Sequence, residues 1–311
     1  MTTNTSSSPS SSAVTPSVVT STVLPVDAAI PPTPLVRLAD GYSIPQIGLG
    51  VLRVENAQTQ PVVESAIEAG YRHIDAAAGY GNEAEVGSAL ESTGFTRGEQ
   101  REQMWVTTKL KDTEQGYASA LAAFDRQIGL LRLEYVDMYM IHWPTPFNWR
   151  ATETWKAFVE LREAGRVRSL GVCNFMPADL DRLKKETGEY PVVNQIELHP
   201  TWQQREVVEY CREKSIAVEA YSPIARGADL TAGDGVLDRI AATHGVSVAQ
   251  VILRWHIENG TIIIPKSVHP ARQIENASLF GFELTPEEHA AVTALDSDHR
   301  AGHDPLTFSY A

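Results

Sequence analysis

The regular alternation of short apolar strands with helical segments most constrains how this chain can fold. Eight strands are predicted, at Ile44–Gly50, Tyr71–Ala77, Met104–Leu110, Tyr135–His142, Val167–Asn174, Val193–His199, Ala217–Ile224 and Thr261–Ser267. Between them, apolar residues recur with helical spacing. The strand ends follow one another at intervals of roughly 25 to 43 residues, which is the size of one strand–helix unit. Strands joined through helices run parallel, so the pattern predicts a parallel sheet.

Eight strand–helix units in about 230 residues suit an α/β fold made of a single (β/α)8 TIM barrel. We assign this barrel to residues 31–311. A short hairpin comes before its first strand, formed by Leu35–Leu38 and Ser43–Ile47 around an Asp40-Gly41 turn. We expect this N-terminal hairpin to close the bottom of the barrel.

Residues 1–30 differ in composition from the rest of the chain. Ser, Thr and Pro dominate, Lys and Arg are absent, and Asp27 is the single acid. Such a segment buries too little apolar surface to fold, so a disordered N-terminal tail is predicted. The tail lacks the positive start and apolar centre of a secretory signal and the arginines of an organelle transit peptide.

Charge and cysteine content narrow the location and the partners. The chain has 26 basic and 39 acidic residues, and 26 − 39 gives a net charge of −13. This balance argues against nucleic acid or anionic membranes as partners, and no apolar run approaches the ~20 residues of a membrane helix. Two cysteines, Cys173 and Cys211, make no disulfide framework and favour a reducing compartment. We therefore expect a cytoplasmic protein.

The predicted strands end in polar residues of reactive types. These are Asp75, Lys109, His142, Asn174, Gln195, Tyr221 and Lys266. In a TIM barrel the active site lies at the C-terminal ends of the strands. Any one of these residues by itself is also explained as a solvated strand terminus, but seven of them after apolar strands favour a shared site.

Four of the candidate residues suggest acid–base chemistry. Lys109 follows a strand that faces the barrel interior and needs a counter-charge, which Asp75 on the neighbouring strand can supply. An ammonium beside a phenol favours the phenolate, so we expect the pKa of Tyr80 to fall below its usual value of about 10. Tyr80 then acts as a general acid. His142 is predicted to donate a hydrogen bond to a carbonyl oxygen.

A second cluster predicts an anion site. Lys266 and Ser267 come just before a helix that begins near Pro270, and Arg272 lies in its first turn. A helix N-terminus with two nearby cations binds phosphate groups well.

A series of motifs runs in order along residues 34–308. The motifs are Gly48-Leu-Gly50, Tyr71-Arg-His-Ile-Asp75, Tyr80-Gly-Asn-Glu83, Thr108-Lys109, Ile141-His142-Trp143-Pro144, Gly171-Val-Cys-Asn174-Phe175, Asn194-Gln195-Ile-Glu-Leu-His-Pro200, Tyr221-Ser-Pro and Ile264-Pro-Lys266-Ser267. This series resembles the aldo-keto reductases, and its fine pattern is most similar to the prokaryotic branch related to 2,5-diketo-D-gluconate reductases.

The resemblance implies a catalytic tetrad of Asp75, Tyr80, Lys109 and His142, and NADPH bound in extended form across the barrel mouth without a Rossmann domain. It implies that Asn174 and Gln195 hold the nicotinamide carboxamide and that Tyr221 stacks on the ring. The further cofactor contacts that it implies are Cys173, Ser222, Ile224, Arg226, Lys266, Ser267, Arg272, Glu275 and Asn276.

The resemblance also suggests details of specificity. Arg272 would grip the 2′-phosphate and so favour NADPH over NADH. Cys173 stands where the family usually has serine, and a thiol is a weaker donor. Leu52, Trp143 and His142 would line the substrate pocket. The implied activity is the NADPH-dependent reduction of an aldehyde or ketone carbonyl, in a keto-sugar, an α-dicarbonyl or a small aldehyde, by a monomer whose site contains no metal.

Three alternatives stay open at this point. Gly79-Tyr-Gly-Asn-Glu-Ala84 spells G-x-G-x-x-A, but the acid that a Rossmann site needs at the end of the next strand is replaced by Lys109. A barrel hydrolase would use Asp75 and Glu197 as paired carboxylates. A non-catalytic NADPH-binding barrel subunit is the third.

Overall fold

The computed structural model describes Met1, Val18–Val19 and residues 30–308. The predicted tail at 1–30 therefore lies almost wholly outside the described residues. Val18–Val19 form the two-residue strand β1, which pairs antiparallel with β2 (Leu35–Arg37). Ile30 is buried, and its N–H donates to the carbonyl of Ala69 at 3.0 Å. The division between tail and barrel after residue 30 stays a prediction.

Eight parallel strands form one sheet in chain order, with every neighbouring pair parallel. They are β4 (Leu49–Gly50), β5 (His73–Asp75), β6 (Trp105–Leu110), β7 (Val136–Ile141), β8 (Val167–Cys173), β9 (Val193–Glu197), β10 (Ala217–Tyr221) and β11 (Ile262–Ile263). The sheet closes through the segment before β4. Gly48 N–H donates to Ile263 O at 2.8 Å, and Ile263 N–H donates to Gln46 O at 2.9 Å. The predicted TIM barrel is confirmed.

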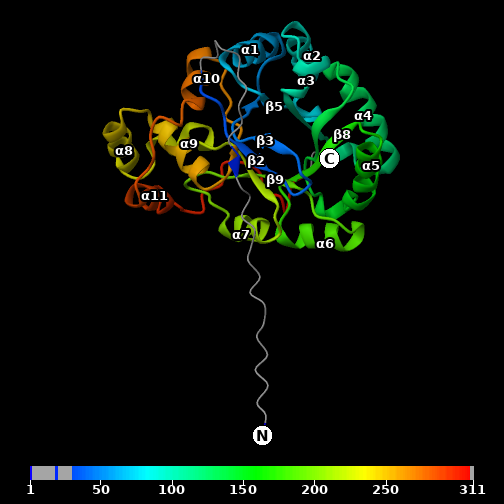
Figure 1. Cartoon of the computed structure of the whole chain (residues 1–311). Helices are drawn as coiled ribbons and strands as arrows, with labels where there is room; N and C mark the ends of the chain where they lie inside the picture. Colours follow the sequence, from blue (N-terminus) through cyan, green and yellow to red (C-terminus); the bar gives the residue numbers. More distant parts are fainter. Residues whose placement is uncertain (2–17, 20–29, 309–311) are drawn as a thin grey trace.

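Helices surround the sheet as a ring (Figure 1). The ring contains α1 (Asn56–Ala69), α2 (Glu83–Ser92), α3 (Gly98–Glu102), α4 (Tyr117–Leu131), α5 (Ala151–Glu163), α6 (Pro177–Thr187), α7 (Arg205–Glu213), α9 (Val248–Glu258) and α10 (Pro270–Ala277). Two further helices, α8 (Val236–His244) and α11 (Pro286–Thr293), lie outside it and share an apolar cluster with α9. Short 3-10 turns occur at η1 (Ala78–Tyr80), η2 (Asp112–Glu114), η3 (Pro146–Asn148) and η4 (Ala225–Thr231).

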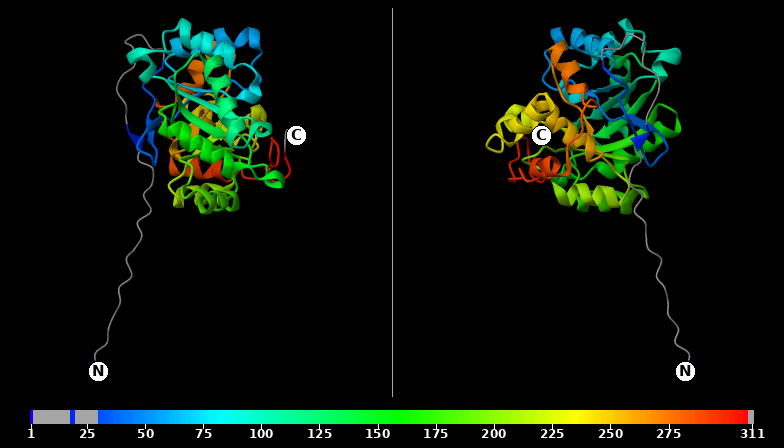
Figure 2. Two further views of the ribbon diagram at one scale, coloured as in Figure 1. Left: turned by 90° about the vertical axis from the view of Figure 1, so that its right-hand side faces the viewer. Right: turned by 60° about the vertical axis from the view of Figure 1, so that its left-hand side comes forward.

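The predicted hairpin is present and covers the N-terminal end of the barrel. Strands β2 and β3 (Ser43–Pro45) pair antiparallel, with Val36 opposite Ile44. These two side chains share one buried cluster with residues at the starts of the barrel strands, namely Trp105, Val193, Ala217 and Ile262. The left view of Figure 2 shows the hairpin (blue) and the C-terminal segment (red) at opposite ends of the molecule. The hairpin therefore leaves the C-terminal mouth open for a site.

Several strands are shorter than predicted. The last prediction ran to Ser267, but β11 ends at Ile263, and Lys266 and Ser267 lie in the loop before α10. Pro265 follows closely and has no N–H to donate to a neighbouring strand. The first prediction merged two elements, because Ile44 belongs to the hairpin and β4 begins only at Leu49.

Within the described residues, no single helix has the length and apolarity to cross a membrane. Helices α8 and α9 meet that criterion only when they are taken together as a pair bent by 89°.

Candidate active site

Two short elements bring Tyr80 to the C-terminal mouth of the barrel. Asp75 is the last residue of β5, and η1 follows almost at once with Tyr80 as its last residue. Gly81 then adopts φ +71°, a left-handed conformation that glycine takes without steric cost, before α2 begins at Glu83. The phenol is therefore held on a single turn between a buried strand and a helix.

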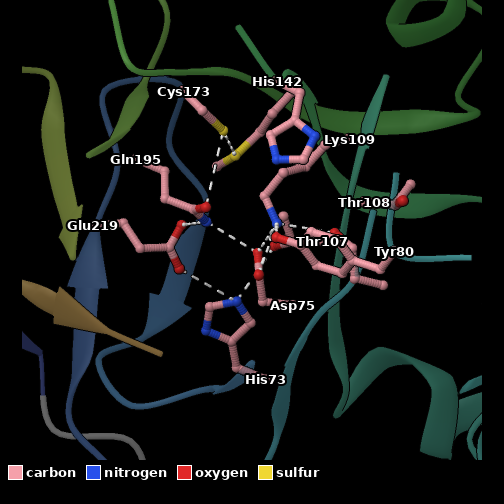
Figure 3. A network of polar contacts seen from close by, with 12 residues as sticks. His73, Asp75, Tyr80, Thr107, Thr108, Lys109, His142, Cys173, Gln195 and Glu219 are labelled. Atoms are coloured by element: carbon pink, nitrogen blue, oxygen red, sulfur yellow. Dashed lines mark hydrogen bonds and ion pairs between the residues drawn. The ribbon is translucent and has the colours of Figure 1, made fainter. Parts of the chain in front are cut away.

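Lys109 connects the carboxylate to the phenol. Its Nζ donates to both oxygens of Asp75, at 2.6 and 2.7 Å, and to the carbonyl of Ala76 at 2.9 Å. The same Nζ lies 3.1 Å from the Tyr80 hydroxyl oxygen. Both Lys109 and Asp75 are buried. Figure 3 shows the three side chains converging, although they come from β5, η1 and β6.

The protonation of these groups differs in part from the prediction. Burial raises the pKa of Tyr80 above its usual value; Lys109 opposes this change but does not overcome it, and Asp75 adds to it. The predicted lowering of the Tyr80 pKa is therefore wrong in this structure, because desolvation outweighs the ammonium. Burial by itself lowers the pKa of Lys109, but Asp75 and Tyr80 raise it above its usual value. At neutral pH the site holds an ammonium beside a protonated phenol.

His142 lies directly after β7 and is buried beside Tyr80. The two rings meet edge to face, with centroids 5.7 Å apart. Burial, with a contribution from Lys109, lowers the pKa of His142 to about 3. The imidazole is therefore neutral at physiological pH, and a neutral imidazole carries one N–H donor.

The amides predicted to hold a carboxamide lie at the same mouth. Asn174 has φ +64°, which asparagine tolerates, and its Nδ2 donates to the carbonyl of His142 at 3.2 Å. Its Oδ1 accepts from the Tyr221 hydroxyl at 2.9 Å. Gln195 donates from Nε2 to Asp75 Oδ1 at 3.0 Å, and Cys173 Sγ lies 3.9 Å from Gln195 Oε1. Asn174, Gln195, Tyr221 and Cys173 thus form one connected group with the predicted tetrad.

The residues predicted for the phosphate end lie in the loop before α10 and in α10 itself. Lys266 and Arg272 are exposed at the start of α10, and neither side chain has a hydrogen bond or ion pair with any residue in the described part of the chain. Ser267 is buried, and its Oγ accepts from the His269 N–H at 3.1 Å. Glu275 is partly buried and Asn276 is buried in the same helix.

The loop after β10 carries the remaining predicted cofactor contacts. Ser222 and Arg226 have φ of +50° and +56°. Ile224 is partly buried between the main core and the α8–α9 cluster. Arg226 is exposed and its guanidinium lies near Gly302 of the C-terminal segment. Within the described part of the chain, no hydrogen bond or ion pair joins Ser222, Ile224 or Arg226 to the tetrad, so their role in cofactor binding stays a prediction.

The two predicted substrate residues differ in exposure. Leu52 is 40% exposed and Trp143 only 5%. Trp143 packs against Phe308, with ring centroids 4.5 Å apart, and Phe308 stacks on His303 at 4.1 Å. Among the described residues, no group of three or more His, Cys, Asp or Glu side chains is placed to hold a metal ion.

The chain matches the Aldo/keto reductase family over residues 46–297. It belongs to this family. An aldo-keto reductase of Mycolicibacterium smegmatis is 46% identical over 278 residues, which is 89% of this chain and 99% of that protein. The methylglyoxal reductase DkgA of Yersinia pestis is 42% identical over 275 residues, which is 88% of this chain and 97% of that protein. A solved mutant of Gox0644 in complex with NADPH matches with a TM-score of 0.83 at 42% identity, covering 89% of this chain and 98% of that one.

Family membership and the barrel remove two of the alternatives. An aldo-keto reductase barrel is not a Rossmann domain, so Gly79–Ala84 is no dinucleotide fingerprint here. Glu197, which a hydrolase would need as the second catalytic carboxylate, is engaged in contacts with His199 and the C-terminal segment. Its Oε1 lies 3.1 Å from His199 Nε2 and accepts from the Ala301 N–H at 2.6 Å. This carboxylate stabilises the C-terminal segment of the aldo-keto reductase.

Two features of this aldo-keto reductase escaped the sequence analysis. Glu219 is fully buried on β10, and its Oε2 accepts from Gln195 Nε2 at 2.9 Å. His199 lies between Glu197 and Asp229, 3.1 Å from each carboxylate, and so connects the loops after β9 and β10 to the C-terminal segment. An acid within the apolar strand Ala217–Tyr221 was a visible signal for Glu219. No local pattern marks the His199 cluster.

Proposed function

We propose that this protein reduces the carbonyl group of small aldehydes and α-dicarbonyls with NADPH, and that Tyr80 is the general acid. The observation that carries the proposal is the convergence of a phenol, an ammonium, a carboxylate and a neutral imidazole at the barrel mouth, with Lys109 Nζ 3.1 Å from the Tyr80 oxygen. The identity to the methylglyoxal reductase of Yersinia pestis supports α-dicarbonyls as the substrate class. Keto-sugars are the next class to test.

The residues at the mouth fit NADPH at both of its ends. Asn174 uses one Nδ2 hydrogen on His142, which leaves a second for a carboxamide oxygen. Lys266 and Arg272 are exposed beside the N-terminus of α10, which suits a 2′-phosphate. The NADPH complex of the Gox0644 mutant, a protein with the same fold, supports this cofactor.

The proton path follows from which groups donate. When bound, NADPH supplies the hydride that the carbonyl carbon accepts. Lys109 has three N–H donors and no acceptor, so it donates to the Tyr80 oxygen and leaves the phenolic hydrogen free for a substrate oxygen. The raised pKa of Tyr80 keeps that hydrogen in place until the carbonyl oxygen becomes basic.

Two neighbours assist the transfer. After the proton leaves, the Lys109 ammonium stabilises the phenolate that remains. Asp75 holds Lys109 in this position through both carboxylate oxygens. The neutral His142 donates its N–H to the substrate oxygen and orients it toward Tyr80.

Replacement of Tyr80 by phenylalanine tests the assignment. Tyr80→Phe keeps the ring and removes the proton donor, so NADPH binding should persist while turnover of methylglyoxal falls by about 10²–10⁴-fold. Binding is measured by quenching of tryptophan fluorescence and turnover by loss of absorbance at 340 nm. Tyr42→Phe is the matched control, because Tyr42 is 43% exposed on the hairpin side of the barrel.

Three outcomes would each contradict part or all of the proposed function. Retained turnover in Tyr80→Phe would show that another group donates the proton. A wild-type protein that binds NADPH but reduces none of the carbonyl compounds would be the non-catalytic barrel subunit. A protein that neither binds nor reduces would refute the proposed function as a whole.

We also propose that the protein is a cytoplasmic monomer. Both cysteines are buried and unpaired, which suits a reducing compartment. Light scattering on the purified chain distinguishes a monomer from a dimer by mass.

A further inference from the structure

A buried carboxyl group lies next to the site and takes no part in the proposed proton path. Glu219 is 0% exposed, on the inward face of β10. Its Oε2 accepts a hydrogen bond from Gln195 Nε2 at 2.9 Å. Its Oε1 has no hydrogen-bond partner among the described residues, and His73 Nε2 lies 3.6 Å away. A buried carboxyl is costly, so its retention inside the barrel calls for a role.

Glu219 and Asp75 together determine which way the Gln195 amide points. Nε2 of Gln195 has two hydrogens, and it donates to Asp75 Oδ1 at 3.0 Å and to Glu219 Oε2 at 2.9 Å. A flipped amide would place its carbonyl oxygen against the Asp75 carboxylate, which is repulsive, and would lose the hydrogen bond from Nε2 to Glu219 Oε2. The carbonyl oxygen of Gln195 is therefore turned to the other side, toward Cys173 (Figure 3).

This orientation limits what Gln195 can offer to a ligand. A free glutamine amide presents a donor and an acceptor, but here both donor hydrogens are used inside the barrel. The remaining group is the acceptor oxygen. Asn174 is complementary, because it keeps a second Nδ2 hydrogen as a donor. An amide ligand at this mouth would therefore give its NH2 to Gln195 and its carbonyl oxygen to Asn174.

We propose that Glu219 is a positioning residue that locks the Gln195 amide, so that Gln195 presents only its carbonyl oxygen to the NH2 of the nicotinamide carboxamide. The inference rests on the proposed function, since it assumes that NADPH binds at this mouth. It predicts that the bond between Gln195 and the cofactor depends on a residue that does not touch the cofactor.

The charges around Glu219 agree with this role. Burial, with Asp75 next in size, raises the pKa of Glu219 to about 8, while Gln195 and Lys109 oppose the rise. Near neutral pH the carboxyl is therefore protonated, and its proton belongs on Oε1 because Oε2 accepts from Gln195. The neutral acid can orient Gln195 without adding a second negative charge beside Asp75. His73, whose Nε2 lies 3.6 Å from Glu219 Oε1, is neutral because burial lowers its pKa to about 3.

An analogue of NADP⁺ that lacks the amide NH2 tests the proposal. In the 3-acetylpyridine analogue a methyl group replaces that NH2, so it cannot donate to Gln195. The wild-type protein should bind NADP⁺ about tenfold more tightly than the analogue, which is the effect of one such hydrogen bond. Glu219→Leu removes one of the two acceptors for Gln195 Nε2 and leaves Asp75 Oδ1, so the amide is held less firmly and the ratio should fall to about twofold or less. Glu219→Gln keeps an acceptor oxygen and should restore the ratio.

Binding of 2′,5′-ADP, which has no nicotinamide, separates this role from a general structural one. Its affinity should be equal in wild type, Glu219→Leu and Glu219→Gln. If Glu219→Leu does not fold, as judged by circular dichroism, Glu219→Met replaces it with the same expectation. A tenfold ratio that survives in the folded variant overturns the inference, and so does an equal loss of affinity for NADP⁺ and 2′,5′-ADP. Absence of NADP⁺ binding in the wild type would instead overturn the proposed function, and the inference with it.

Discussion

Replacing Lys109 by methionine probes the interaction on which the site depends most. Lys109 is fully buried, and its ammonium joins Asp75, Ala76 and Tyr80. Methionine has a similar length and no charge. The variant therefore leaves the Asp75 carboxylate in the barrel with the hydrogen bond from Gln195 but without its counter-ion.

The cost follows from the geometry of the pair. Charges 2.6 Å apart, as in Lys109 and Asp75, attract by roughly 6 kcal/mol at an effective dielectric constant of about 20. Desolvation of both ions offsets much of this attraction in the native protein. Removal of one partner leaves the other desolvated, so Lys109→Met should lower the free energy of unfolding by about 3–5 kcal/mol.

A double variant separates charge from packing. Asp75→Asn/Lys109→Met removes both charges and keeps an acceptor oxygen for Gln195, so it should regain at least about 2 kcal/mol relative to Lys109→Met. Stability is measured by urea unfolding at pH 7, with circular dichroism as the signal. Turnover of methylglyoxal should stay at least about 10²-fold below wild type in both variants, because neither has an ammonium to stabilise the Tyr80 phenolate.

Three results would refute parts of this reasoning. A loss of under about 1 kcal/mol in Lys109→Met would mean that the carboxylate is not desolvated as the structure indicates. A double variant no more stable than Lys109→Met would mean that packing around the lysine chain, and not charge, determines the cost. Near wild-type turnover in the double variant would remove Lys109 from the proposed mechanism.

Two further predictions concern the cofactor and pH. Arg272→Ala should raise the apparent KM for NADPH by about tenfold or more and leave the apparent KM for NADH nearly unchanged, because only NADPH carries the 2′-phosphate. Arg97→Ala, at the exposed N-cap of α3, is the control. Equal effects of Arg272→Ala on both cofactors would contradict the assignment. For His199, burial alone would lower the pKa, but hydrogen bonds to Asp229 and Glu197 raise it, and the pKa values of both carboxylates are lowered. Because its pKa is raised, His199 stabilises the fold fully below about pH 6.5, and this contribution is lost as the pH rises through the folded-state pKa. Because their pKa values are lowered, the two carboxylates stabilise the fold above about pH 4. The stability advantage of wild type over His199→Gln should therefore be largest near pH 5–6 and shrink toward pH 9 in urea unfolding, whereas a constant difference across this range would show that His199 contributes by packing only.

Most of the barrel and the central part of the site were predictable from local patterns. Asp75 and Lys109 follow apolar strands, and strand ends in a parallel barrel meet at one rim, so their proximity could be inferred before any distance was known. The helix start predicted near Pro270 was also correct. The last strand was extended too far because apolar content alone does not show that Pro265, which has no N–H, cannot donate to a neighbouring strand.

The errors concern properties that depend on the whole environment of a group. The effect of Lys109 on Tyr80 was correct in sign, but the burial that outweighs it comes from many surrounding residues. Glu219 was overlooked because its role depends on a hydrogen bond from Gln195 on the adjacent strand, which the sequence does not show. His199 needs a carboxylate from the end of β9, Glu197, and one from the distant segment η4, Asp229.

The amino-acid sequence by itself determined the order of strands and helices, the barrel they form and the kinds of side chain at its rim, because periodicity and turn chemistry act over a few neighbouring residues. Only the tertiary structure decided how those side chains are protonated and oriented. Desolvation and hydrogen-bond partners come from segments far apart in the chain, as Gln195 and Asp75 are, with 120 positions between their numbers. Such long-range contacts cannot be recognised in a short stretch of sequence. In this protein they determine the orientation of the Gln195 amide and the protonation of the Tyr80 phenol.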